Sequence, residues 1–152
     1  MPLISPVPLP TLEATSALAR RLAPQLMQGD LLALKGDLGA GKTTFARALL
    51  QEMGVMGDVP SPTFTLVQSY DPPPFAVHHF DLYRLKTADE LDELGWDEAL
   101  TEGVSVVEWP ERAEGRLPKD YLLLRFTMDD KKSRHCTLEP HGLWLERMKE
   151  IP

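Results

Sequence analysis

The strongest chemical signal in the chain is the segment 36–43, which reads GDLGAGKT. This segment fills every fixed position of the phosphate-binding pattern Gly-x-x-x-x-Gly-Lys-Thr. The glycines allow backbone N–H groups to turn inward around phosphate oxygens, and the N-terminus of a following helix adds a positive dipole. We therefore expect a nucleotide site in which Lys42 contacts the β- and γ-phosphates and the Thr43 hydroxyl binds Mg²⁺.

The segments around this loop have the patterns of a strand and a helix. The apolar run 31–34 is typical of a buried strand, and Gly54 provides a left-handed helix end. Between the loop and Gly54, apolar residues recur at helical spacing: Phe45, Ala46, Leu49, Leu50 and Met53. The order strand, glycine loop, helix favours a phosphate site over a chance glycine turn.

Two acidic residues are candidates to hold Mg²⁺, directly or through water. Asp81 follows the predicted strand 75–80, and Glu108 follows the predicted strand 104–107. Each stands at the C-terminal end of its strand, the edge of such sheets where ligands bind. We expect at least one of the two to serve the nucleotide, and the sequence leaves open which is the general base.

Two further polar segments have simpler interpretations beside the chemical ones. The segment 61–65, which reads SPTFT, is either a switch loop facing a γ-phosphate or a polar turn. His78 and His79 are neighbours in a predicted strand, so their side chains point to opposite faces and cannot form a two-histidine metal site with one another. We expect each to be a hydrogen-bonded structural histidine.

The remaining patterns outline the fold. A helix capped by Thr11 is predicted over 11–27, and strands over 64–70 and 75–80 are predicted to form an antiparallel hairpin. Further predicted elements are an acidic helical segment at 87–100, strands at 121–126 and 136–139, and a terminal helix at 142–149. Alternation of strands and helices around a phosphate loop indicates an α/β fold, and the hairpin makes its mostly parallel sheet mixed.

Length and composition indicate one soluble domain, 1–152. The chain has 152 residues, of which 43% are hydrophobic and 26% charged. It has no run of about 18 apolar residues, and its first residues lack the pattern of a signal peptide, so no membrane association is expected. The single cysteine, Cys136, cannot form an internal disulfide. These features favour a cytoplasmic protein.

The charge of the chain argues against direct binding of nucleic acid. Its net charge is −7, whereas a protein that holds tRNA or DNA by itself normally presents a basic face. The compact basic cluster 131–134, which reads KKSR, is expected to be a solvated turn between two strands. Any role on a nucleic acid would therefore require a partner that supplies most of the contact.

The segment 87–102 is strongly acidic, and we expect a solvated helix face, with a docking surface for a basic partner as the alternative. Its acidic residues are Asp89, Glu90, Asp92, Glu93, Asp97, Glu98 and Glu102.

The nucleotide is expected to be ATP. Asparagine is absent from the chain, so it lacks the Asn-Lys-x-Asp motif with which familiar GTPases read guanine. A Thr-Lys-x-Asp substitute is absent as well.

Four blocks in order carry a resemblance to a known family. They are 36–44 (GDLGAGKTT), 61–64 (SPTF), 79–84 (HFDLYR) and 108–111 (EWPE). With this spacing the chain resembles the bacterial TsaE family, formerly called YjeE, over about 11–139. The resemblance implies a P-loop NTPase fold, with a single compact domain and a mixed, mostly parallel sheet flanked by helices.

The resemblance also implies a function. TsaE is the small ATPase of tRNA threonylcarbamoyladenosine biosynthesis, a modification of the adenosine beside the anticodon. The family acts as an accessory ATPase on the TsaD–TsaB pair, which transfers the threonylcarbamoyl group. The chain is therefore expected to bind ATP and Mg²⁺, to have TsaD and TsaB as partners and to reach tRNA only indirectly. We expect a slow ATPase until a partner completes the site.

Residue roles follow from the same resemblance. Thr43 and Glu108 resemble the family's Mg²⁺ ligands, and Asp81 resembles its essential aspartate, which would orient the attacking water. The phosphates would be held by Lys42 and the backbone amides of Gly39, Ala40 and Gly41. Thr44 would lie near the α-phosphate, with Thr11 or Thr15 and Arg134 at the rest of the nucleotide. Trp109 would either close over the site or shape the partner surface, and Arg84 is a candidate arginine finger.

Two other classes of protein share parts of this pattern. A small-molecule kinase would need an acceptor pocket and an arginine-bearing lid, for which Arg112 and Arg116 are the nearby candidates. A non-catalytic sensor would bind ATP tightly without hydrolysis and report through the acidic face. A metabolite-dependent burst of ADP would favour the first, and tight binding without turnover would favour the second.

Overall fold

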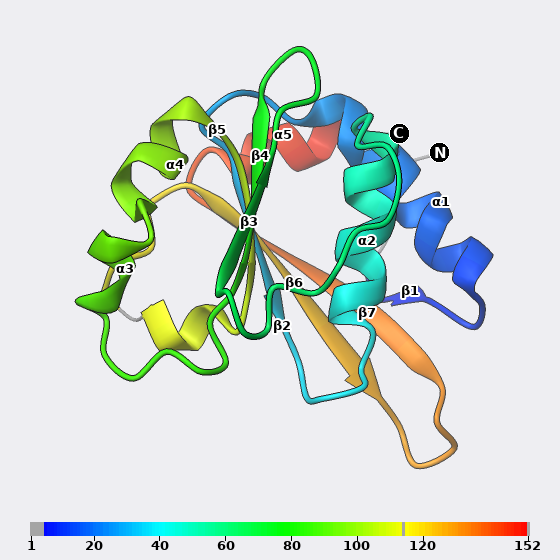
Figure 1. The fold of residues 1–152 in the computed structure, drawn as a ribbon. Helices are drawn as coiled ribbons and strands as arrows, with labels where there is room; N and C mark the ends of the chain where they lie inside the picture. The colour runs from blue at the N-terminus through cyan, green and yellow to red at the C-terminus, as the bar shows by residue number, and fades with distance from the viewer. Residues whose placement is uncertain (1–4, 114, 152) are drawn as a thin grey trace.

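A mixed β-sheet organises the part of the chain that the computed structural model describes, residues 5–113 and 115–151. Within those residues the sheet has seven strands, which lie in the order β1-β7-β6-β2-β5-β4-β3 (Figure 1). Their bounds are β1 (Val7–Pro8), β2 (Leu31–Lys35), β3 (Val67–Tyr70), β4 (Ala76–Asp81), β5 (Gly103–Glu108), β6 (Tyr121–Met128) and β7 (Arg134–His141).

The centre of the sheet is parallel and its edges are antiparallel. Strands β6, β2, β5 and β4 run parallel to one another, whereas β7 and β1 on one side and β3 on the other are antiparallel to their neighbours. Strand β5 is buried along its whole length, as expected for a parallel strand that is covered on both faces. The predicted α/β class and mixed sheet are confirmed.

Helices cover both faces of the sheet (Figure 1). Helices α1 (Leu12–Leu22) and α2 (Lys42–Glu52) lie on one face, and the short helices α3 (Glu90–Glu93) and α4 (Trp96–Glu102) lie on the other. The chain also forms α5 (Trp144–Arg147) and three 3-10 turns, η1 (Ala23–Gln25), η2 (Pro110–Ala113) and η3 (Met148–Glu150). Among the described helices, none is long and apolar enough to cross a membrane.

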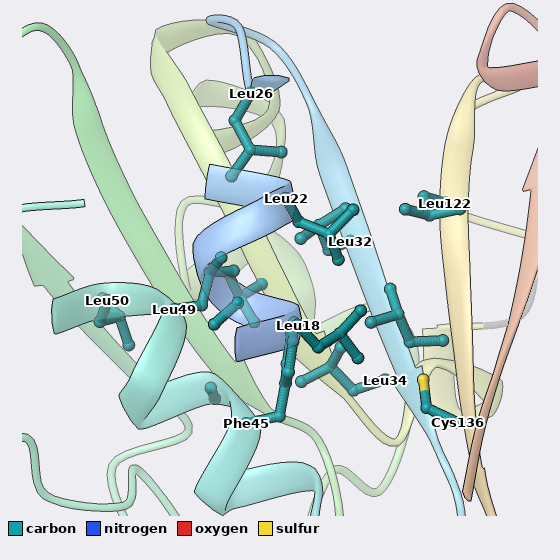
Figure 2. Close-up of a cluster of buried hydrophobic side chains, with 14 of the residues drawn as sticks. Leu18, Leu22, Leu26, Leu32, Leu34, Phe45, Leu49, Leu50, Leu122 and Cys136 are labelled. Atoms are coloured by element: carbon teal, nitrogen blue, oxygen red, sulfur yellow. The ribbon is translucent and has the colours of Figure 1, made fainter. Parts of the chain in front are cut away.

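The alternation of side chains along β2 divides the core into two clusters. Leu32 and Leu34 point to the α1–α2 face, where they meet apolar side chains of both helices, as Figure 2 shows for Leu18 and Phe45. Leu31 and Ala33 point to the opposite face. Because both faces of β2 are buried in this way, the loop that follows it leaves the sheet from a fixed position.

Several predicted boundaries are wrong for local reasons. The first helix stops at Leu22 and tightens to a 3-10 turn, because Pro24 cannot donate a helical hydrogen bond. The acidic segment is two helices rather than one, because Gly95 lies between them with a φ of 76°. The terminal helix starts at Trp144 and ends in a 3-10 turn.

The two edges of the sheet also depart from the prediction. Strand β3 begins at Val67 rather than at residue 64, because residues 62–66 form a turn in which the backbone N–H of Leu66 donates to the carbonyl of Pro62 at 2.7 Å. Strand β1 was not predicted, because two residues that include a proline carry no recognisable alternation. The hairpin of β3 and β4 is confirmed as antiparallel.

The basic cluster 131–134 joins β6 and β7, as predicted for a turn between strands. The Asp129 carboxylate accepts hydrogen bonds from the backbone N–H groups of Lys131 and Ser133, each at 2.9 Å, and so closes the turn.

Candidate functional site

The glycine-rich loop connects the buried strand β2 directly to α2. The close approach of the loop to β6 requires glycine at position 36, because an added Cβ would stand 2.5 Å from the carbonyl oxygen of Phe126. Gly41 precedes the helix with a φ of 112°, which side chains disfavour. The first amides of α2 lack partners inside the helix, so the loop meets the general requirement for an anion site at a helix N-terminus.

Lys42 is the first residue of α2 and its ammonium group lies inside the loop. Its Nζ donates to the carbonyl of Gly36 and, at 3.2 Å, to that of Asp37. The same atom lies 3.7 Å from the centroid of the Trp109 ring, a cation–π contact. Burial lowers the pKa of Lys42 from 10.5, and the nearby carboxylates of Glu108, Glu111, Asp81 and Asp37 oppose the shift.

A chain of hydrogen bonds joins α2, β5 and β4 beside this lysine. The Thr43 hydroxyl donates to Oε1 of Glu108 at 2.8 Å, and Nε2 of His79 lies 2.7 Å from Oε2 of the same carboxylate. Glu108 is 1% exposed and His79 is 0% exposed. A hydroxyl beside a carboxylate is a donor set that Mg²⁺ accepts, so the residues present fit this cation.

The described residues contain no group of three or more His, Cys, Asp and Glu side chains placed to hold a metal. A magnesium ion at Thr43 and Glu108 would therefore take its other ligands from water and substrate oxygens, as Mg²⁺ commonly does in proteins.

Asp81 stands beside Glu108, in register with it across the parallel strands β4 and β5. Its Oδ1 accepts from the backbone N–H of Tyr83 at 3.1 Å, and its Oδ2 accepts from the Thr63 hydroxyl at 3.3 Å. The Ser61 hydroxyl lies 2.7 Å from that of Thr63. The segment 61–65 is thus tied to the second acid, which the sequence alone did not indicate.

Strand alternation explains why these side chains meet. Positions 79 and 81 of β4 share one face, and Glu108 shares that face on β5, because Val77, Val104 and Val106 all belong to the core cluster under α1 and α2. Phe80 and Val107 point to the opposite cluster. The two-residue spacing between His79 and Asp81 was the signal that could have identified His79 as part of the site.

Both histidines are hydrogen-bonded, as the sequence predicts. Nδ1 of His78 lies 2.8 Å from the Ser69 hydroxyl, and Nε2 of His79 contacts Glu108. They differ in their surroundings, because only His79 contacts a residue that lines the cleft described next.

These elements enclose a cleft of about 570 Å³. All ten residues predicted for the site line it: Thr11, Gly39, Ala40, Gly41, Lys42, Thr43, Thr44, Asp81, Glu108 and Arg134. Thr15 and Trp109 line it too, and so do four residues that the sequence did not predict: Leu9, Pro10, Leu12 and Tyr83. The Thr11 side chain is also the cap of α1, accepting from the backbone N–H of Ala14 at 3.1 Å.

Three arginines considered for the site are not among the lining residues in the described part of the chain. The Arg84 guanidinium lies over the exposed Phe64 ring, 4.5 Å from its centroid. Arg116 donates to Asp92 at 2.6 Å and to the carbonyl of Ala88 at 3.2 Å, so it fastens the acidic segment instead of forming a lid. Arg112 lies on η2 and is not one of the residues that line the cleft.

Comparisons with known proteins agree with this architecture. The family described as threonylcarbamoyl adenosine biosynthesis protein TsaE matches residues 9–136. A relative named tRNA threonylcarbamoyladenosine biosynthesis protein TsaE, from Bacillus subtilis strain 168, is 39% identical over 139 residues, which cover 91% of this chain and 87% of the relative. A relative of the same name from Rickettsia felis is 39% identical over 127 residues, covering 83% and 74%.

A solved structure gives the same result. The crystal structure of Bacillus subtilis YdiB superposes with a TM-score of 0.75 at 31% identity, and the match covers 92% of this chain and 87% of that one. The match of the family to most of the chain, with these relatives, identifies the protein as a member of the TsaE family.

Proposed function

We propose that this protein is an ATP-binding and ATP-hydrolysing accessory factor in the biosynthesis of threonylcarbamoyladenosine in tRNA, acting on the TsaD–TsaB transferase pair. Membership of the TsaE family supports the pathway, because the relatives carry that pathway in their names. The observation that carries the enzymatic part is the 2.8 Å contact between Thr43 and Glu108 beside Lys42, at the wall of the cleft. Phosphate-binding NTPases need a hydroxyl and an acid together at this position.

The groups of the chain have separate roles in ATP binding and hydrolysis. Backbone amides of residues 39–41 and the Lys42 ammonium bind the β- and γ-phosphates and compensate the charge that develops on them. Thr43 and Glu108 hold Mg²⁺, which supplies neutralisation of phosphate charge when it is bound. Asp81 orients the attacking water through a carboxylate whose direction is set by Thr63 and by the backbone of Tyr83.

The rest of the cleft would receive the nucleoside. Leu9, Pro10 and Leu12 give it an apolar wall, and Thr11 and Thr15 add polar groups. The Arg134 side chain lies beside the phosphate loop, with its Cδ 4.0 Å from the position of a Cβ added at Gly41. Few polar groups on an apolar wall are typical of a site for a flat heterocycle.

The positions of the arginines support slow hydrolysis by the isolated protein. Among the described residues that line the cleft, Arg134 is the only arginine, and Arg84 stacks on Phe64 instead. An arginine at the γ-phosphate accounts for a rate factor of about 10³–10⁵ in related chemistry, so a partner that completes the site would stimulate turnover strongly. The net charge of −7 supports indirect contact with tRNA.

The alternatives receive less support. A kinase lid would have to come from Arg112 or Arg116, and neither lines the cleft within the described residues. A non-catalytic sensor would not require a second acid at the site, whereas Asp81 lies in register with Glu108.

The test is hydrolysis of ATP with Mg²⁺ by the full chain, alone and with the cognate TsaD–TsaB pair. We expect slow turnover alone, stimulation by the pair, and loss of both in Glu108→Ala. Glu146→Ala, an exposed glutamate on α5, is the matched control and is expected to behave as the wild type. Tight ATP binding without hydrolysis under either condition would contradict the enzymatic part of the proposal.

A further inference from the structure

We infer that His79 is a positioning residue that fixes the Glu108 carboxylate in the orientation needed for Mg²⁺, an inference that rests on the proposed function of Glu108. The imidazole is completely buried and its Nε2 lies 2.7 Å from Oε2 of Glu108. A carboxylate oxygen accepts, so Nε2 is the donor in this contact. Short hydrogen bonds to an ionised carboxylate are among the stronger ones in proteins.

The Glu108 carboxylate is held from two sides. Its Oε1 accepts from Thr43 on α2, and its Oε2 accepts from His79 on β4. Thr43 can exchange this contact for the cation that it is proposed to bind, whereas His79 lies behind the carboxylate in the core and keeps its contact. The histidine is therefore the partner that sets the direction of the carboxylate when the cleft is loaded.

Glu108 is the only hydrogen-bond partner of the imidazole within the described residues, because Nδ1 of His79 is buried and unpaired. Its one side-chain hydrogen bond in that part of the chain therefore links β4 to the site residue Glu108 on β5. His78, its neighbour, points to the opposite face of β4 and bonds to Ser69 across the edge pair of strands β3 and β4. The adjacent histidine, which is half-buried, is therefore a control for loss of a hydrogen-bonded imidazole from the same strand without a contact to Glu108.

Loss of the imidazole would leave Oε2 of Glu108 buried without a donor. A buried carboxylate oxygen without a hydrogen bond is costly, so the side chain would rotate, take up water or bind a proton. Each outcome removes the orientation in which both Thr43 and Glu108 offer oxygen to one cation. The expected consequence is a higher requirement for Mg²⁺, with little change in the contacts of the loop amides to phosphate.

The experiment compares His79→Gln, His79→Asn and His79→Leu with the wild type and with His78→Leu. Gln carries a terminal amide N–H at about the reach of Nε2, whereas Asn is too short and Leu has no donor. Binding of a fluorescent, non-hydrolysable ATP analogue is measured in a titration with Mg²⁺ and again in EDTA. Removal of an outer partner of a metal ligand typically weakens the metal about 10–100-fold, so the Mg²⁺ midpoint is expected to rise by about tenfold or more in the Asn and Leu variants.

A second readout does not involve the metal. Urea unfolding of His79→Leu, Glu108→Ala and the double variant, all without Mg²⁺ or nucleotide, forms a double-mutant cycle for the contact itself. We expect the two substitutions to be strongly non-additive, with the double variant little less stable than His79→Leu.

The outcomes separate the two claims. Rescue of the Mg²⁺ midpoint by Gln, with unchanged analogue binding in EDTA and a wild-type midpoint in His78→Leu, supports a positioning role. An unchanged midpoint in Asn and Leu variants that still fold, or an equal shift in Gln and Leu, overturns the inference. A wild-type protein that binds no ATP analogue under any condition overturns the proposed function instead.

Discussion

Glu108 and Asp81 end neighbouring parallel strands in register, yet they are held in different ways. Glu108 is hydrogen-bonded by Thr43 of helix α2 and by His79 of strand β4, so regular elements hold it on both sides. Asp81 is hydrogen-bonded by Thr63 in a connecting loop and by the backbone of Tyr83, which follows the strand. Groups on helices and strands keep a more constant geometry than groups held by loops.

This difference supports separate roles for the two acids in the proposed function. A metal ligand needs the same direction in every turnover, which suits Glu108. A group that orients water in one step and releases it in the next suits the loop-held Asp81.

The largest effect is expected for Asp81→Asn. A positioned general base or water-orienting group contributes about 10²–10⁴-fold to the rate, so turnover with the TsaD–TsaB pair should fall by that factor while ATP binding stays near the wild-type value. Single-turnover hydrolysis and analogue binding measure the two quantities. Asp58→Asn, at an exposed loop position, is the control. Joint loss of binding and turnover would remove the distinction between the two acids.

Lys42→Ala tests the group that both acids face, since the charges of Glu108 and Asp81 each raise the pKa of Lys42 against the effect of burial. Removal of a charge-compensating donor typically costs about 10²–10³-fold in turnover. Steady-state hydrolysis with the partner pair measures this loss. Lys131→Ala, in the exposed turn between β6 and β7, should retain full activity. A fully active Lys42→Ala protein would contradict the site as a whole.

Thr63→Val keeps the shape of the side chain and removes its donor to Asp81. This bond to a carboxylate is long, at 3.3 Å, so we take the lower end of the range for a charged acceptor, about 1.5 kcal/mol. We therefore expect a fall in turnover of about tenfold with no change in the Mg²⁺ requirement. The matched variant is Thr65→Val, which lies two residues away and whose hydroxyl accepts from Gln68 instead. An equal fall in both variants would mean that the loop, and not the contact with Asp81, is responsible.

The smallest effect concerns pH. Burial lowers the pKa of Lys42 below 10.5, so the unfolded chain retains this proton to higher pH than the folded protein does. Below the folded pKa the buried charge therefore costs stability, and the cost shrinks as the pH rises toward 10.5. As the pH rises from the folded pKa of Lys42 toward its unfolded value, urea unfolding should show the free energy of unfolding of the wild type rising relative to that of Lys42→Met. A difference that stays constant over the same window would show that the pKa is not lowered.

The sequence predicted the parts of the molecule whose signals are local. The strand β2, the phosphate loop and α2 follow one another within 31–52, and each has its own pattern of apolar spacing and glycine. The break at Gly95 and the edge strand β1 were missed, because a single left-handed glycine and a two-residue strand leave little pattern.

The contacts within the site were harder to predict, because they join residues far apart in the chain. His79 and Glu108 are separated by 29 positions, and Thr63 and Asp81 by 18. Their meeting depends on the register of β4 against β5 and on the path of the loop before β3, which only the folded sheet defines. The residue types were visible beforehand, whereas their partners were not.

The most direct test of the separate roles of the two acids is a titration with Mg²⁺ of ATP-analogue binding by Glu108→Ala and Asp81→Ala, measured side by side with the wild type. We expect Glu108→Ala to require much more Mg²⁺, whereas Asp81→Ala should keep the wild-type requirement although its turnover is lost. Equal requirements in the two variants, or a greater requirement in Asp81→Ala, would contradict the assignment of Glu108 as the metal-holding acid.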